Sequence, residues 1–123
     1  MTATVDGLRL RKALGREQWQ APEPFGPDGW RMVSRAGDCS VIVTTAEFEG
    51  ATWTHASRTA PDRVPTYEEM IELHRAVWGE TGYSYQVQAP LAQHVNIHPN
   101  ALHLWGRADG RAVLPEFASW GTI

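Results

Sequence analysis

The chain has 123 residues, with 11 lysine and arginine residues against 14 aspartate and glutamate residues, so its formal net charge is −3. This length predicts one domain with one hydrophobic core. The single Cys39 excludes the intramolecular disulfides that small secreted scaffolds usually need, so we expect a cytoplasmic protein. No stretch approaches the about 20 apolar residues that cross a bilayer, so we expect no membrane partner.

Residues 1–24 are expected to form a basic, proline-rich N-terminal arm that is partly extended, and residues 25–123 to form a single α+β domain. The charged side chains at the start of the arm are mostly basic, namely Arg9, Arg11, Lys12 and Arg16 against Asp6. This density is low for a tail that binds nucleic acid, so a nucleic-acid partner is disfavoured. Pro22, Pro24 and Pro27 then predict an extended connector without a helix.

Three consecutive strands are predicted next, and they should form an antiparallel meander. Residues 30–35 and 39–45 flank Gly37, which can adopt the positive φ of a tight hairpin. A third strand follows in the stretch ATWTHASR, where alternation places Trp53, His55 and Ser57 on one face.

The clearest helix signal is a capping box formed by Thr66 and Glu69. A stripe at helical spacing follows, and Gly79 can end the helix. The stripe consists of Tyr67, Met70, Ile71, His74, Val77 and Trp78.

Two more strands are predicted at residues 83–88 and 101–105, the second with Leu102 and Leu104 facing away from His103 and Trp105. The order of elements is therefore βββαββ. Because strands cluster on both sides of one helix, we expect an α+β fold: a single-layer antiparallel sheet of about five strands with one helix on one face.

The densest polar group is the histidine-rich stretch HVNIHPNALHLW, and His55 can approach it if its strand lies beside the last one. Neutral imidazoles suit transition metals, but Pro99 and the following strand disfavour the helical spacing that such sites use. We therefore interpret the histidines as structural, and predict no catalytic residue, metal ligand or cofactor. The candidate pocket consists of His55, Asn96, His98, His103 and Trp105.

Six tryptophans are many for this length, and most should fill the layer between helix and sheet. Trp19 and Trp120 lie in the flanks, and together with Phe117 they are candidate partner-binding residues. The alternative is that these rings pack back onto the same domain.

The order of segments over residues 25–123 resembles a small domain of unknown function encoded by tailed phages and prophages. The resemblance is carried by the stretches GWRMVSRAGDCSVIVT, WTHAS, VPTYEEMIELHRAVWG, QVQAP and VNIHPNALHLW and by the final GTI. Matching positions include Trp53, His55, Asn96, His98, Pro99, His103, Leu104 and Trp105. The resemblance implies an origin and a shape, and no reaction.

We therefore expect a small phage-encoded accessory protein that binds a host or phage protein without catalysis, in the host cytoplasm. A homo-oligomer is compatible with this hypothesis. One alternative is a small hydrolase or metal-binding enzyme that uses His55, His98 and His103, and a second is a minor virion component.

Overall fold

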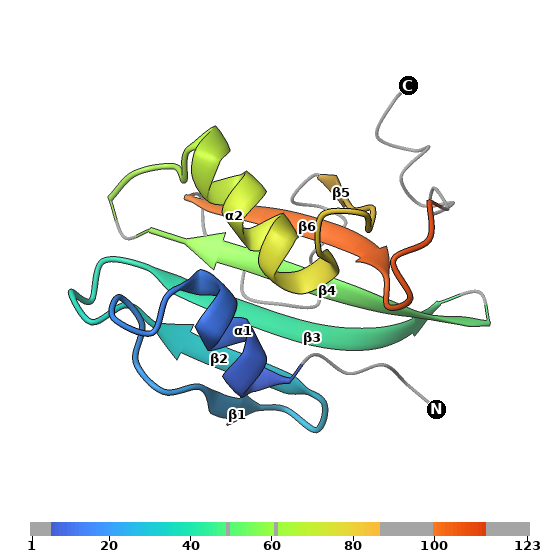
Figure 1. Cartoon of the computed structure of the whole chain (residues 1–123), viewed down its shortest axis with the longest axis horizontal. Coiled ribbons are helices and arrows are strands. Elements are labelled where there is room, and N and C mark those ends of the chain that lie inside the picture. Colours follow the sequence, from blue (N-terminus) through green and yellow to red (C-terminus); the bar gives the residue numbers. More distant parts are fainter. Residues whose placement is uncertain (1–5, 49, 61, 87–99, 113–123) are drawn as a thin grey trace.

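The computed structural model describes residues 6–48, 50–60, 62–86 and 100–112. These residues form an antiparallel sheet of six strands in the order β1-β2-β3-β4-β6-β5, with two helices on one face (Figure 1). The strands are β1 (Glu23–Phe25), β2 (Gly29–Val33), β3 (Ser40–Phe48), β4 (Ala51–Thr59), β5 (Tyr85–Gln86) and β6 (Ala101–Arg107). The helices are α1 (Gly7–Leu14) and α2 (Tyr67–Trp78).

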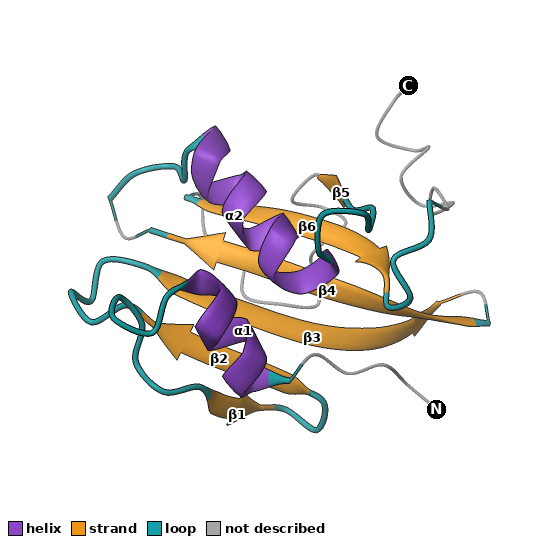
Figure 2. Ribbon diagram, in the orientation of Figure 1, coloured by secondary structure: helices purple, strands orange, loops and turns teal. Residues whose placement is uncertain are grey.

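The predicted α+β class is confirmed: a helix packs against an antiparallel sheet (Figure 2). The capping box at the start of α2 is present, with Glu69 N donating to Thr66 Oγ1 and Thr66 N donating to the Glu69 carboxylate. Gly79 ends the helix at φ 76°, a backbone conformation that favours glycine. Of the strand predicted at residues 83–88, Tyr85–Gln86 form β5, while Tyr83 and Ser84 precede it outside any strand. Residues 87–88 lie outside the described residues.

The N-terminal arm, predicted to be partly extended, contains the helix α1, which the sequence analysis did not predict. Asp6 caps this helix, because its side chain accepts a hydrogen bond from Leu8 N. Leu10 and Leu14 lie one turn apart, and both are buried in the same core as the sheet. In the sequence, the basic residues of this segment are more prominent than its short apolar stripe, so no helix was predicted here. In the predicted connector, Glu23–Phe25 are extended and form the edge strand β1.

The core lies between the sheet and the two helices. Alternation along β3 and β4 directs Val41, Val43 and Ala56 to this side, where they meet Leu73 of α2. The other buried apolar members are Leu10, Leu14, Trp19, Met32, Cys39, Ala60, Trp78, Leu102 and Leu104. Burial of this one shared layer fixes the positions of both helices on the sheet.

We predict that Leu73→Ala lowers the free energy of unfolding by about 3 kcal/mol, because it leaves a cavity beneath α2. Leu8→Ala is the matched control on α1, since Leu8 is 68% exposed, and it should change stability by less than about 0.5 kcal/mol. Urea denaturation of both variants measures the difference, and equal losses would contradict the assignment of the core.

Candidate functional site

The face of the sheet opposite the helices holds two of the predicted histidines, His55 and His103. The β4–β6 register places His55 opposite Trp105 and Ser57 opposite His103. These residues alternate with Ala56, which belongs to the core on the helix side. The structure therefore brings together His55, His103 and Trp105 of the predicted pocket. Asn96 and His98 lie outside the described residues.

The two imidazoles form a buried pair. His55 Nε2 lies 3.0 Å from His103 Nδ1, and their parallel rings have centroids 5.2 Å apart. The ring of Trp105 also stacks on the His55 imidazole, with the two ring centroids 4.8 Å apart. His55 is 1% exposed and His103 is 4% exposed, so water has little access to either ring.

Burial decides the charge of this pair. Burial, with a smaller contribution from the neighbouring His103, lowers the pKa of His55 to about 4. Burial also lowers the pKa of His103. Both rings are therefore neutral at pH 7, and one donates a hydrogen bond to the other. His103 Nε2 has no hydrogen-bond partner among the described residues.

A metal centre finds no support in the described ranges, where no group of three or more His, Cys, Asp or Glu side chains could hold an ion. His74 lies apart on α2, where its Nδ1 is 2.7 Å from Ser84 Oγ and its ring stacks on Trp78. Its burial lowers its pKa. A neutral imidazole in this position bridges α2 and the segment before β5.

The predicted partner-binding residues need one correction. Trp19 was expected to be available on a flank, but it is 1% exposed and belongs to the core. Its backbone forms a bridge with Ser34, which draws the arm onto the sheet beside β2. Phe117 and Trp120 lie outside the part of the chain that the structure describes.

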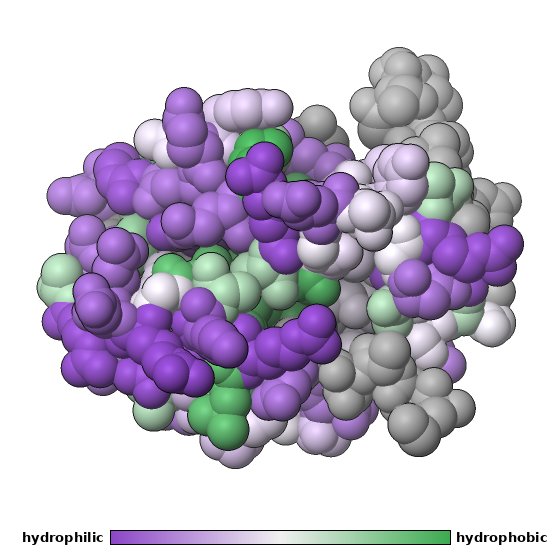
Figure 3. Space-filling model, in the orientation of Figure 1, coloured by the Kyte–Doolittle hydropathy of each residue, from purple (hydrophilic) through white to green (hydrophobic). Residues whose placement is uncertain are grey.

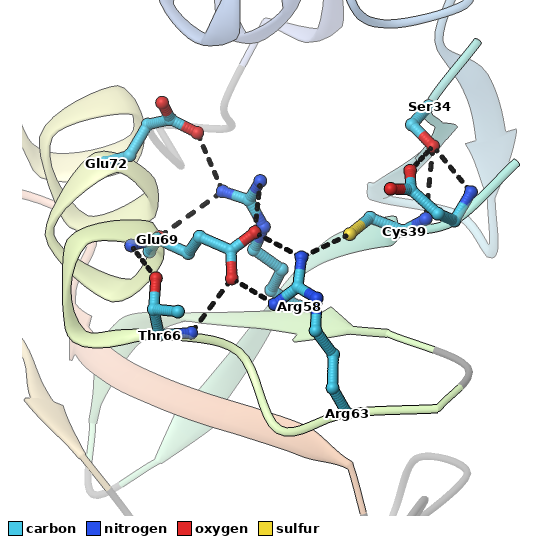
Figure 4. A network of polar contacts seen from close by, with 8 residues as sticks. Ser34, Cys39, Arg58, Arg63, Thr66, Glu69 and Glu72 are labelled. Carbon is cyan, nitrogen blue, oxygen red and sulfur yellow. Dashed lines mark hydrogen bonds and ion pairs between the residues drawn. The ribbon is translucent and has the colours of Figure 1, made fainter. Parts of the chain in front are cut away.

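A charged network that the sequence analysis missed connects β4 to α2 (Figure 4). The side chain of Arg58 is only 7% exposed, and it pairs with Glu69 at 3.3 Å and Glu72 at 2.8 Å. Arg63 binds both oxygens of Glu69, at 2.5 and 2.9 Å. The hydrogen bonds from Arg63 are the largest influence that lowers the pKa of Glu69 to about 2, so this carboxylate remains charged. In the sequence, the signal for this network was the alternation along the strand, which places Arg58 on the same face as Ala56.

A groove runs between the two helices on the outer side of the core. Two cavities of about 550 and 370 Å³ share Ala13, Arg75 and Ala76, so they form one continuous groove. Ile71 adds an apolar side chain at one end, and Leu10 and Val77 add two at the other. Figure 3 shows this hollow, with hydrophobic residues at its base between two hydrophilic ridges.

A family model for a domain of unknown function, DUF7694, matches residues 45–109. The chain belongs to this family. Searches of curated proteins and of solved structures found no match. The matched segment of this DUF7694 protein contains the histidine pair, Arg58 and all of α2. Helix α1, Trp19 and Cys39 lie before it, so the groove combines a family helix with a helix that precedes the matched segment.

Among the described residues of this DUF7694 protein, no helix is long and apolar enough to span a membrane.

We predict that acid destabilises the protein through His55. Its pKa is about 4 in the folded state against an ordinary 6.5, so the unfolded chain binds more protons between these values. The stabilisation is complete above pH 6.5 and is lost as the pH falls towards 4, by about 3 kcal/mol in total. Urea unfolding at several pH values measures this slope. His55→Gln should flatten it to the smaller part that His74 and His103 contribute, and an unchanged slope would contradict the assignment.

We predict that Glu69→Gln costs about 2 kcal/mol of unfolding free energy, because it removes one partner from the buried Arg58 and weakens the helix cap. The adjacent Glu68 is exposed, so Glu68→Gln is the matched control and should change stability by less than about 0.5 kcal/mol. Thermal unfolding followed by circular dichroism compares the two. A Glu69→Gln variant as stable as the control would show that the network contributes nothing.

Proposed function

We propose that this DUF7694 protein is a non-enzymatic binding module that holds an amphipathic helix of a partner protein in the groove between α1 and α2. The observation that carries the proposal is the continuous groove with apolar residues from both helices along its length. Helices bind such grooves through apolar side chains spaced three or four residues apart.

The length of the groove suits a short helix. Helix α2 has 12 residues, which corresponds to about 18 Å at 1.5 Å per residue. A partner helix of about three turns therefore spans the groove. Ala13 and Ala76 are small, so they leave room for larger apolar side chains of the partner.

Charges at the two ends give the partner an orientation. Glu68 and Glu72 line the end near the start of α2, where they favour a basic residue of the partner. Arg9 lines the other end together with Asp6, which caps α1, and Arg75 lies between the two ends because it borders both cavities. The proposed occupant is thus an amphipathic helix with lysine or arginine at the end that meets Glu68.

The biological setting belongs to the same proposal. We propose a phage-encoded accessory protein that acts in the host cytoplasm on a host or phage protein. Its support is the order of motifs from the first predicted strand to the final residues, which resembles a phage domain. Detection of the protein in purified virus particles would instead favour a minor virion component.

We predict that Ala13→Arg blocks partner binding, because a long charged side chain then fills the middle of the groove. Ala13 is exposed and lies on a helix, so the fold should tolerate the change. Ala36→Arg makes the same substitution at an exposed turn outside the groove and serves as the control.

The measurement has two stages. Affinity capture with all three proteins identifies a partner that the wild type and Ala36→Arg retain and Ala13→Arg loses. Calorimetry with that purified partner should then show an affinity at least about tenfold weaker for Ala13→Arg. A partner that binds Ala13→Arg as tightly as the wild type, or no retained partner at all, would overturn the proposal.

A further inference from the structure

A second cavity, of about 380 Å³, shares no lining residue with the groove. It lies where the segment after α1, the β2–β3 turn, the end of β4 and the start of α2 meet. The lining residues that matter here are Trp19, Ser34, Cys39, Arg58, Arg63 and Glu69. Its volume is within the range of small-molecule sites.

Two buried nitrogen donors in this lining have no hydrogen-bond partner among the residues that the structure describes. They are Trp19 Nε1 and Arg58 Nε. The two side chains are in contact, because the guanidinium carbon of Arg58 lies 5.3 Å from the centroid of the Trp19 ring. Buried donors in folded proteins are nearly always paired, so two unpaired donors in one contact pair indicate a missing acceptor.

Three other polar groups of the lining, namely the Ser34 hydroxyl and the terminal nitrogens of Arg58 and Arg63, already have hydrogen-bond partners. Figure 4 shows the terminal nitrogens of Arg58 directed at α2, where they bind Glu69 and Glu72. Arg63 binds the carboxylate of Glu69 through both of its terminal nitrogens. The Ser34 hydroxyl donates to Asp38 and accepts from two backbone nitrogens. Neither Trp19 Nε1 nor Arg58 Nε has a hydrogen-bond acceptor among the described residues.

The charges around the two donors admit an anion. Arg35, Arg58 and Arg63 line the cavity against Glu17, Asp38 and Glu69. Glu69 and Glu72 bind the terminal nitrogens of Arg58, and Glu69 also binds Arg63, so these two carboxylates balance the two guanidinium charges. The Nε–H of Arg58 is a charge-assisted donor without a partner among the described residues, and such a donor suits an anionic oxygen. Arg63 is 43% exposed, so it is one of the lining side chains that border solvent.

Covalent chemistry at this site is disfavoured by the state of Cys39. The thiol is buried, and burial together with Asp38 raises its pKa. A protonated thiol is a poor nucleophile. The cavity therefore has the properties of a binding site.

We propose that this cavity binds a small oxyanion, a carboxylate or a phosphate, whose oxygen accepts hydrogen bonds from Trp19 Nε1 and Arg58 Nε. Both ligands offer the same chemistry, an anionic oxygen with free lone pairs. The site is independent of the helix groove, and a ligand here holds the arm, β4 and α2 together.

Nuclear magnetic resonance of the ¹⁵N-labelled wild type tests the proposal directly, because indole and arginine Nε–H groups give separate signals. Acetate and inorganic phosphate are titrated separately, with acetamide as the neutral probe and chloride at equal ionic strength as the salt control. The Trp19 signal is assigned as the one lost in Trp19→Phe. The Trp78 signal is the internal reference, since its Nε1 already donates to the carbonyl of Arg107.

The expected result is a saturable shift of the Trp19 and Arg58 signals with acetate, phosphate or both, while the Trp78 signal stays in place. Acetate and phosphate then distinguish a carboxylate from a phosphate ligand. Absence of a shift, a shift with acetamide or chloride alone, or equal shifts of Trp19 and Trp78 would each overturn the proposal.

Arg58→Lys provides a second test, because lysine keeps the positive charge beside Glu69 and removes Nε–H. The affinity for the better anion should fall about tenfold, which corresponds to one lost hydrogen bond to a charged group. Arg31→Lys is the matched control, since Arg31 pairs with Glu23 on the exposed edge of the sheet. If Arg58→Lys fails to fold, the wild-type titration decides the matter alone.

Discussion

The central strand β4 is the constraint on which the rest of the structure depends. Residues 53–58 are all buried, so both faces of the strand are covered. Strict alternation then assigns each side chain to one of two environments. Ala56 and Arg58 point to the helices, while His55 and Ser57 point to the opposite face. A shift of one residue in the β4–β6 register would move the imidazoles into the helix layer and the guanidinium out of it.

Arg58 links this alternation to the position of α2, because its guanidinium points from β4 towards that helix. A guanidinium buried beneath a helix needs carboxylates within reach, and Glu69 and Glu72 on the first turns supply them. Glu69 also completes the helix cap and binds Arg63, so one carboxylate joins the strand, the loop and the helix. The position of α2 in turn defines one wall of the groove and one wall of the second cavity.

The N-terminal segment supplies the other walls of both cavities. Helix α1 forms the groove with α2, and Trp19 covers Arg58 beside the second cavity. Both features precede residues 45–109, which match the family model. The family segment thus contributes α2, β4, β5, β6 and the end of β3. The preceding segment adds β1, β2 and the start of β3, together with α1 and Trp19, which complete the two separate concave sites.

Local signals in the sequence were sufficient for much of this fold. The capping box at Thr66 and Glu69, the turn at Gly37 and the alternation around His55 depend on contacts between near neighbours, and the structure shows all three. Pairing His55 with His103 requires that β4 and β6 be adjacent, and no local signal in the sequence determines this adjacency. Helix α1, the burial of Trp19 and the pairing of Arg58 with α2 were decided by tertiary structure. Each of these features depends on contacts between segments that are distant in the sequence. A basic arm that is solvated and one that packs on the sheet have the same local sequence pattern, so the pattern alone does not distinguish them.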